Sequence, residues 1–286
     1  MTLASTPLVT VITPTYNRRD YIVETVESVL RQDYPRIEYI VLDDGSVDNT
    51  AEVLKPYLDR LTYLRHDNMG ETKTVNKGYA LALGEFIMVV NSDDPLYTED
   101  AVSLLARCLT DHPECNAIYP DWIRIDHEGH PLGEIRQVDF DITNMLLDFN
   151  VTLGPGMLIR TQSLRAIGLR NETLRYTGDL DVSFRLALVG KLCHLKTVVA
   201  THREHHGAAS SAQKGDRMAD EVLRLAVESL KSPLLPRELL RRKNIILCRA
   251  YTVALCYFSG LSPRREFFRI LQWYYTLASR LFPPLP

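Results

Sequence analysis

The sequence predicts an α/β fold in which helices cover both faces of a mostly parallel sheet, followed by a helical C-terminal appendage. Over the first 110 residues, short β-branched runs alternate with amphipathic helical patterns. Such alternation is typical of strand–helix–strand units, whose strands pair in parallel. After residue 216 the periodicity is helical. With 286 residues and 45% hydrophobic residues, the chain is large enough for one substantial core.

Four strands and four helices are expected in the first 110 residues. Short apolar runs predict strands at about residues 8–13, 37–42, 61–65 and 86–90. Apolar residues at helical spacing predict helices at about 22–30, 48–58, 72–83 and 98–108. Three polar clusters each follow a strand directly, at residues 14–17, 43–46 and 91–94. Because ligands bind beyond the carboxyl ends of parallel strands, all three clusters should face one crevice.

The remaining chain divides at about residue 215. Residues 116–215 mix helical and strand-like patterns, with a hairpin turn at 126–131 and a polar loop at 203–215. Beyond residue 216, apolar positions recur at helical spacing on both sides of a turn at 260–263. The sequence therefore predicts a main domain at 1–215 and a C-terminal helical hairpin at 216–286.

Positive charge is concentrated at the C-terminal end. The formal net charge of −3 gives no indication of nucleic-acid binding by the whole chain. Residues 237–286 hold nine Lys or Arg and two Glu, so this segment carries +7 and the rest of the chain −10. A basic segment on an acidic body favours an anionic partner, such as a membrane surface. A helical hairpin packed on the main domain or on a second subunit is the alternative.

The cysteines and the apolar runs bear on localisation. The five cysteines include no C-x-x-C pair, so neither a disulfide framework nor a zinc site is expected, and a reducing compartment is favoured. The N-terminus lacks a signal-peptide pattern, and no run of about 18 charge-free apolar residues occurs. We expect a cytoplasmic protein. Peripheral contact at the inner membrane face through the basic C-terminal helices and packing of these helices on protein are the two alternatives.

Acidic and histidine side chains are the candidates for chemistry. Asp93 and Asp94 suit a hard divalent cation, because Mg²⁺ and Mn²⁺ take carboxylate oxygens together with substrate phosphates; a turn with helix-capping acids is the alternative. Asp179 is a candidate general base, whereas a helix cap followed by an ion pair between Asp181 and Arg185 would serve structure alone. A neutral imidazole among residues 202–206 is able to ligate a metal.

The order and spacing of these pieces closely resemble family 2 glycosyltransferases of the GT-A fold, a Rossmann-like α/β architecture. The resemblance covers roughly residues 8–210, and as a set its motifs are highly specific. The motifs are VITPTYN at 11–17, ETVESVLRQ at 24–32, VLDDGSVD at 41–48, NMG at 68–70, NKG at 76–78, NSDD at 91–94, YPDW at 119–122, DLDVSFR at 179–185 and REH at 203–205. By this resemblance, residues 1–115 form the nucleotide-binding half and 116–215 the acceptor half of one catalytic domain.

The resemblance implies a role for each matched residue. It assigns the nucleotide and donor sugar to Pro14, Thr15, Tyr16, Asp44, Asn68, Lys77, Asp93, Asp121 and Arg185. It assigns a Mn²⁺ or Mg²⁺ ion to Asp94, Asp93 and His205, and the role of catalytic base to Asp179. The implied reaction moves a sugar, with inversion, from a nucleotide-diphosphate donor to a hydroxyl of a glycan or lipid-linked acceptor. UDP or dTDP is favoured as the nucleotide, GDP is an alternative, and cell-surface polysaccharide synthesis is the implied process.

Departures from the family pattern keep a second function open. Gly178 stands where an acid often precedes the base, and Asn91 stands two residues before Asp93 in place of an acid. A catalytically silent relative that binds a nucleotide-sugar or a glycan is therefore the alternative. The Gln-x-x-Arg-Trp motif of processive synthases is absent, which favours transfer of single sugars. No Gly-rich loop follows the first strand, which argues against a pyrophosphorylase or a dinucleotide oxidoreductase.

Overall fold

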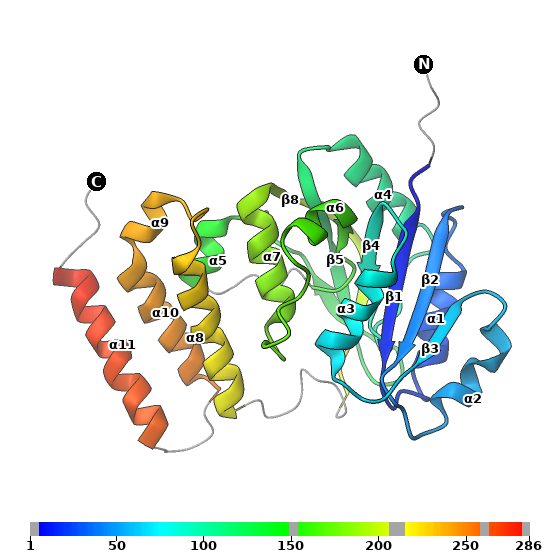
Figure 1. The fold of residues 1–286 in the computed structure, drawn as a ribbon, viewed down its shortest axis with the longest axis horizontal. Helices are drawn as coiled ribbons and strands as arrows, with labels where there is room; N and C mark the ends of the chain where they lie inside the picture. Colours follow the sequence, from blue (N-terminus) through cyan, green and yellow to red (C-terminus); the bar gives the residue numbers. More distant parts are fainter. Residues whose placement is uncertain (1–5, 149–153, 206–214, 258–262, 282–286) are drawn as a thin grey trace.

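The computed structural model describes residues 6–148, 154–205, 215–257 and 263–281, and they form one eight-stranded sheet flanked by helices (Figure 1). The strands are β1 (Val9–Thr15), β2 (Ile37–Asp43), β3 (Thr62–Arg65), β4 (Phe86–Val89), β5 (Cys115–Ile125), β6 (Pro131–Ile135), β7 (Leu158–Arg160) and β8 (Lys191–Arg203). The helices are α1 (Ile22–Leu30), α2 (Thr50–Leu54), α3 (Glu71–Leu81), α4 (Ala101–Asp111), α5 (Ile142–Asp148), α6 (Thr161–Ala166), α7 (Gly178–Val189), α8 (Gly215–Lys231), α9 (Arg237–Arg241), α10 (Lys243–Leu255) and α11 (Pro263–Leu281). A 3₁₀ turn, Lys55–Tyr57, continues α2.

The first half of the sheet is parallel, as the sequence predicts. Strand β1 pairs in parallel with β2 on one side and with β4 on the other, and β3 continues the sheet beyond β2. All seven residues of β1 are buried, because helices cover both of its faces, and this explains why the strand reads as a continuous β-branched run. The four predicted strands and four predicted helices are confirmed, with ends that differ by a few residues.

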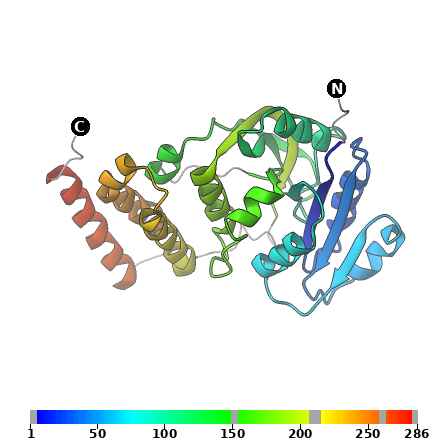
Figure 2. The same ribbon diagram turned by 45° about the horizontal axis from the view of Figure 1, so that its top comes forward.

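Two hydrophobic clusters lie on opposite faces of the sheet. One joins α1 and α4 to β1 and β4 through side chains such as Val26, Leu105 and Met88. The other joins α3 and α7 to the sheet through side chains such as Val75 and Phe184. In Figures 1 and 2, α3 and α7 lie on the opposite side of the strands from α1. The carboxyl ends of β1, β2 and β4 therefore lie together at one edge of the sheet, and helices cover both of its faces.

The second half of the sheet is mixed, and its order does not follow the chain. Strand β7 lies between β4 and β5, antiparallel to both. The predicted turn at 126–131 joins β5 and β6 as an antiparallel hairpin, and the long strand β8 runs parallel to β5. Of the predicted loop at 203–215, residues 206–214 lie outside the described chain.

A disulfide joins β5 to β8, which corrects the expectation drawn from the cysteine count. Cys115 and Cys193 are 78 residues apart in sequence, with Cα atoms 6.0 Å apart. The parallel pairing of β5 with β8 brings them side by side. A separation of 78 residues does not by itself predict this pairing. The other three cysteines, Cys108, Cys248 and Cys256, are free.

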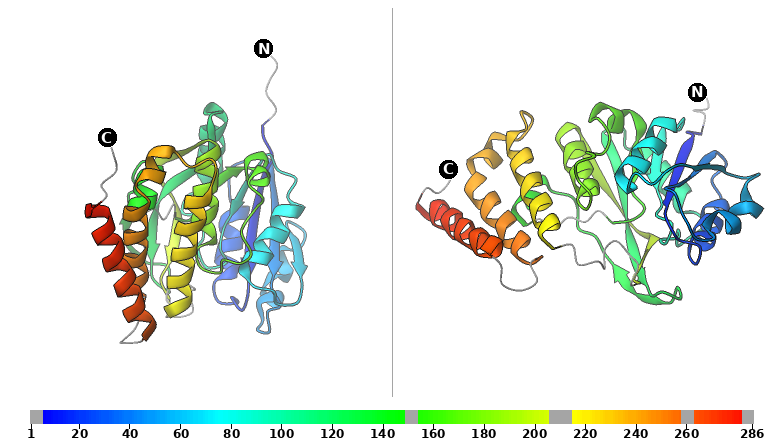
Figure 3. Two further views of the ribbon diagram at one scale, coloured as in Figure 1. Left: turned by 60° about the vertical axis from the view of Figure 1, so that its left-hand side comes forward. Right: turned by 60° about the horizontal axis from the view of Figure 1, so that its bottom comes forward.

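The chain after residue 215 is helical, as predicted. Helices α8, α10 and α11 pack side by side as a layer at one end of the molecule (Figure 3). Ala226 of α8 and Ile246 and Ala250 of α10 belong to the same hydrophobic cluster as the sheet residues Ile12 and Ala117. Of the predicted turn at 260–263, residues 260–262 lie outside the described residues and Pro263 begins α11. No described helix is both long enough and apolar enough to span a lipid bilayer.

Candidate active site

The loops that follow β1 and β2 are fastened to each other at the carboxyl edge of the sheet. The backbone N–H of Asp44 donates to the carbonyl of Thr15 (2.9 Å), and that of Asn17 donates to the hydroxyl of Ser46 (2.9 Å). Asn17 adopts a left-handed φ of 52°, which asparagine tolerates better than most residues. Tyr16 projects from this junction and is 44% exposed, so its ring is accessible to a planar ligand. Pro14 and Thr15 are buried beneath it.

Asp44 organises the next loop along the sheet edge. Its carboxylate is buried and accepts hydrogen bonds from the backbone N–H groups of Met69 (2.7 Å) and Gly70 (3.0 Å). The side chain of Asn68 donates to the Asp44 carbonyl (2.9 Å). A Cβ at Gly45, where φ is +80°, would lie 2.8 Å from the Asn68 nitrogen, so glycine is needed there. The loops that carry Tyr16, Asp44 and Asn68, which are predicted to bind the nucleotide, therefore lie side by side at the carboxyl edge of the sheet.

The acids after β4 are held by side chains from three other segments. Asp93 accepts hydrogen bonds from Arg18 Nε (3.1 Å) and lies 3.0 Å from His205 Nε2, both at Oδ2. Asp94 is buried, and its Oδ1 lies 3.6 Å from His202 Nδ1. The nearby Asp94 carboxylate raises the pKa of His202 above its usual value, although burial opposes this shift. The structure thus pairs Asp93 with His205 and Asp94 with His202.

Arg203 is the central support of this cluster. Its side chain is only 1% exposed. Its backbone N–H donates to Asp94 Oδ1 (2.8 Å), and its Nε donates to the Asp93 carbonyl (3.0 Å). Its guanidinium also donates to the Asp126 carbonyl (3.1 Å) and to the Glu24 carboxylate. One buried side chain therefore ties the acidic loop to α1 and to the β5–β6 hairpin.

The ligand atoms of the three predicted metal residues, Asp93, Asp94 and His205, do not form one compact group. Among the residues described, the groups of three ligand-type side chains with atoms within 4.8 Å of one another are Glu114–Cys115–Cys193 and Asp126–Glu128–His130. Asp93 and His205 are instead hydrogen-bonded to each other. A Mg²⁺ or Mn²⁺ ion is usually held by one or two carboxylates, with the remaining ligands from phosphates and water. The carboxylates of Asp93 and Asp94 fit that requirement without a preformed cage.

Asp179 occupies the first turn of α7 and is exposed. Burial lowers the pKa of Arg170, but the neighbouring Tyr79, Glu71 and Asp179 together raise it above its usual value. Asp179 therefore lies within electrostatic reach of this arginine. A Cβ at Gly178 would lie 3.9 Å from Arg170 Cδ, an ordinary contact. The structure therefore does not require glycine at the position before the candidate base.

Glu221 of α8 fixes the segment that leads into α7, and the sequence pattern gave no indication of it. Its buried carboxylate accepts hydrogen bonds from the backbone N–H groups of Arg175 (2.8 Å), Tyr176 (2.7 Å) and Thr177 (3.0 Å). These are the last residues before the helix that carries Asp179. Glu221 lies on the buried face of α8 with Val222 and Leu225, so an acid within the apolar positions of a predicted helix is the signal that could have identified it.

We expect Glu221→Gln to slow turnover while leaving nucleotide binding intact. An amide offers one acceptor oxygen in place of two, so at least one buried N–H loses its partner, at a cost of about 1–3 kcal/mol. The start of α7 should then become mobile. Donor hydrolysis and nucleotide-induced thermal stabilisation would be measured side by side. The matched control is Glu228→Gln on the same helix, which loses only an exposed pair with Lys231. Equal effects of the two variants would contradict the positioning role.

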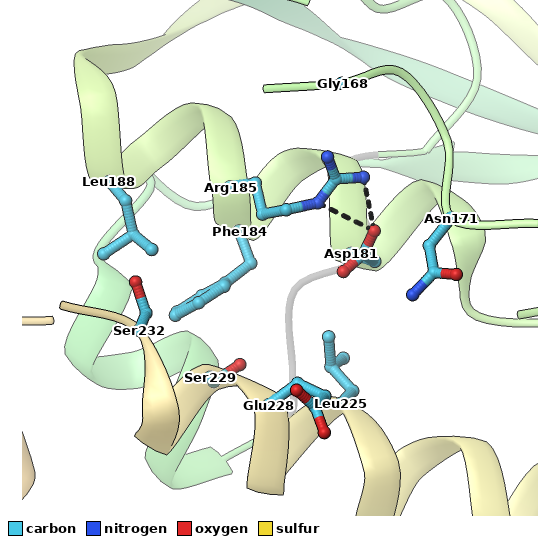
Figure 4. A pocket seen from close by; sticks show the side chains of 10 residues that line it. All are labelled: Gly168, Asn171, Asp181, Phe184, Arg185, Leu188, Leu225, Glu228, Ser229 and Ser232. Atoms are coloured by element: carbon cyan, nitrogen blue, oxygen red, sulfur yellow. Dashed lines mark hydrogen bonds and ion pairs between the residues drawn. The ribbon is translucent and has the colours of Figure 1, made fainter. Parts of the chain in front are cut away.

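Two further predicted donor residues, Lys77 and Arg185, line pockets. Lys77 lines an open pocket of about 660 Å³ together with Lys73 and Arg170. Arg185 pairs with Asp181, as in the alternative interpretation, and lines a pocket of about 420 Å³ between α7 and α8 (Figure 4). Its guanidinium also donates to two backbone carbonyls just after α6. Through these contacts Arg185 connects α7 to the segment that follows α6, which is a structural role.

Asp121 is buried in a polar network of its own. Its carboxylate accepts hydrogen bonds from Arg136 Nη1 (3.0 Å) and from the backbone N–H of Gln137 (2.8 Å), and lies 2.8 Å from His194 Nε2. Burial alone would raise the pKa of Asp121, but these hydrogen bonds hold it below its usual value. His194 stacks on Tyr119 with ring centroids 5.0 Å apart. The structure thus supplies Asp121 with protein partners on both oxygens.

Comparison with known proteins gives the class of protein. Residues 10–158 match the model of glycosyl transferase family 2. The match covers more than half of the chain, and the chain belongs to this family.

Individual relatives agree with this assignment. An uncharacterized glycosyltransferase of Rickettsia typhi is 30% identical over 208 residues, which are 70% of this chain and 64% of that protein. Chondroitin synthase of Escherichia coli is 28% identical over 269 residues, 88% of this chain and 37% of the synthase. The chain therefore spans less than two thirds of the length of these two relatives.

Solved structures share the fold. S. aureus TarS residues 1–349 in complex with UDP-GlcNAc matches with a TM-score of 0.69 at 21% identity, covering 96% of this chain and 91% of that one. A mannosyltransferase from Pyrobaculum calidifontis in complex with GDP-Man and Mn²⁺ matches with a TM-score of 0.62 at 18% identity, covering 98% and 88%. The mostly parallel sheet, its flanking helices and the C-terminal helical region are those of a GT-A glycosyltransferase.

Proposed function

We propose that this glycosyltransferase moves a single sugar from a nucleotide-diphosphate donor to a hydroxyl of a glycan or lipid-linked acceptor, with inversion. The observation that carries the proposal is the cluster at the carboxyl edge of the sheet. There the buried Arg203 donates to both Asp93 and Asp94, and Asp93 lies beside His205. The exposed ring of Tyr16 and the loop ordered by Asp44 extend the same edge. This arrangement offers an aromatic surface for a base and a pair of acids for a metal–diphosphate.

In this proposal Asp93 and Asp94 hold a Mn²⁺ or Mg²⁺ ion, with His205 as a further ligand or a diphosphate contact. Such an ion, when bound, supplies positive charge for the departing diphosphate. Arg18, which donates to Asp93, adds a second cation on this side of the site. Asn91 donates to Asp94 Oδ2 (3.0 Å), so the amide that replaces an acid here supports a metal carboxylate. The neighbour of known structure that holds GDP-Man and Mn²⁺ is consistent with this donor set.

Asp179 is the proposed base. Its carboxylate accepts the proton of the acceptor hydroxyl, and the oxygen forms a bond to the anomeric carbon from the face opposite the diphosphate. The bond between that carbon and the diphosphate oxygen breaks in the same displacement, so the configuration inverts. A base placed in this way contributes about 10²–10⁴-fold to a rate. Exposure of Asp179 at the start of α7 leaves it accessible to an incoming hydroxyl.

The identity of the nucleotide is inferred from Asp44, and the biological process is inferred from a relative. UDP or dTDP is favoured, through Asp44, and GDP is the alternative. Chondroitin synthase, a relative, points to polysaccharide synthesis as the process. We place the reaction on the cytoplasmic side, at the inner membrane face if the acceptor is lipid-linked. Residues 1–215 act as the catalytic domain in this proposal, and residues 216–286 support α7 through Glu221.

Nucleotide diphosphates with Mn²⁺ are expected to raise the melting temperature. At a ligand concentration 100 times Kd, the folded state gains about 2.7 kcal/mol, which corresponds to roughly 5–10 °C for a chain of this size. UDP, dTDP, GDP, ADP and CDP would be compared with and without Mn²⁺. Asp94→Asn should abolish the metal-dependent part of the shift, and the matched control Asp100→Asn, at an exposed acid before α4, should retain it. A shift that survives Asp94→Asn would contradict the proposed metal site.

A catalytically silent relative is the second candidate, favoured by Gly178. Such a protein would show the nucleotide shift but no turnover of any donor. Slow hydrolysis of a donor sugar by water, which needs no acceptor, separates the two functions. Hydrolysis that requires Asp179 supports the enzyme, and a nucleotide shift without hydrolysis of any donor tested supports the silent relative.

A further inference from the structure

The outer surface of α11 carries a continuous apolar stripe. Its members, Phe267, Ile270, Trp273, Tyr274, Leu277 and Leu281, are between 39% and 65% exposed. The spacing of 267, 270, 274, 277 and 281 alternates between three and four residues, which keeps these side chains on one side of a helix. We call this surface the α11 face. Three of its six members are aromatic, so it is far from the polar surface expected for an outermost helix (Figure 3).

The opposite side of α11 already anchors the helix to the protein. Phe268 is buried, and its ring meets Tyr251 of α10 edge to face at 5.4 Å. Tyr275 stacks on the same tyrosine at 5.7 Å, and Gln272 donates to the Thr252 hydroxyl (2.8 Å). The α11 face is therefore not needed to hold α11 in place. Within the described chain, no other element covers it.

The positive charge around the α11 face indicates which kind of partner would bind there. Arg269 and Arg280 are exposed on α11, where Arg269 lies 3.3 Å from Glu266. With this acid counted, residues 237–286 still carry a net +7. Two copies joined through this face would bring two strongly basic segments together, at an electrostatic cost. An anionic bilayer is complementary to the same charge, at about 1 kcal/mol for each basic residue near its surface. Trp and Tyr also prefer the headgroup level of a membrane, where an apolar ring and a polar edge are both satisfied.

We propose that the α11 face docks this protein on an anionic lipid bilayer. The helix lies along the surface, with the aromatic and aliphatic side chains of the face among the upper acyl chains and Arg269 and Arg280 at the phosphates. Because α11 stays packed on α10, the protein binds peripherally and as a folded whole. This docking would hold the catalytic domain near lipid-linked molecules, but it stands whether or not the proposed transfer reaction is correct.

Vesicle co-sedimentation of the full chain tests the proposal. Vesicles of phosphatidylcholine alone would be compared with vesicles of equal parts phosphatidylcholine and phosphatidylglycerol. Binding should be about tenfold or more stronger on the anionic vesicles, and Arg269→Ala with Arg280→Ala should weaken it by about tenfold or more. The matched control is Arg60→Ala with Arg107→Ala, two arginines outside the C-terminal helices, which should leave binding unchanged.

The apolar contribution is tested separately. Ile270→Glu with Trp273→Glu should abolish sedimentation without lowering the melting temperature, because both side chains are more than 60% exposed. Leu83→Glu with Leu132→Glu places the same charges on exposed leucines elsewhere and should have no effect. No sedimentation, equal sedimentation with both vesicles, or a solution dimer that Ile270→Glu with Trp273→Glu dissociates would each overturn the proposal. Nucleotide-induced stabilisation of the same preparations reports on the transfer function independently.

Discussion

Asp179→Asn is expected to lower kcat for sugar transfer by about 10²–10⁴-fold, because an amide accepts no proton from the acceptor hydroxyl. Asp179 is exposed in the first turn of α7, and its replacement should not disturb packing. The melting temperature and the stabilisation by nucleotide with Mn²⁺ should therefore match those of the unchanged protein. Initial rates of donor hydrolysis and of transfer to an acceptor would be measured.

Asp181→Asn is the matched control for this prediction. It removes a carboxylate two residues further along the same helix, where Asp181 is buried and pairs with Arg185. We expect this variant to lose stability and to retain kcat in the folded fraction. If Asp179→Asn kept full activity while Asp181→Asn lost it, the base would have to be assigned elsewhere.

Arg203→Ala is expected to be the most destabilising single change in the site. The substitution removes the Arg203 donor from the Asp93 carbonyl and one of two donors from the Asp126 carbonyl, which keeps the Gly129 N–H. It also removes the buried cation that pairs with Glu24. Loss of a buried charged donor with several partners costs about 3 kcal/mol or more. The acidic loop should loosen, so the Mn²⁺-dependent stabilisation should also fall. Chemical denaturation and nucleotide titrations with Mn²⁺ would measure both effects.

Two further variants test whether the geometry of the Arg203 guanidinium matters in addition to its positive charge. Arg203→Lys keeps a positive charge but cannot span the Asp93 carbonyl and Glu24, so it should rescue stability only in part. Arg124→Ala, on the neighbouring strand β5, breaks an exposed ion pair with Glu204 (2.7 Å) and should cost less than about 1 kcal/mol. An Arg203→Ala variant as stable as Arg124→Ala would contradict the supporting role of Arg203.

The candidate site was partly readable from the sequence because its main pieces are local. Asp44 and the pair Asp93–Asp94 directly follow apolar runs that form β2 and β4, and parallel strands place their carboxyl ends at one edge. The approach of His205 to Asp93 was predictable only through the family resemblance, since 112 residues separate the two. The chemical roles of these residues stay predictions until the variants described above are measured.

The sequence by itself determined the parallel half of the sheet, the helices of residues 1–111 and the helical character of the C-terminal region. Periodicity of 2 or 3.6 residues reports which side chains are buried within one element, and turn residues mark where it ends. These are short-range properties, so a linear pattern is sufficient to encode them.

Only the tertiary structure decided the insertion of β7 between β4 and β5, the Cys115–Cys193 disulfide and the contact of Glu221 with the segment before α7. It also decided that the α11 face is exposed. Each of these depends on pairing between elements far apart in the chain, or on which of two apolar sides finds a partner. Burial and strand order arise from the packing of the whole chain, and no local pattern of residues specifies them.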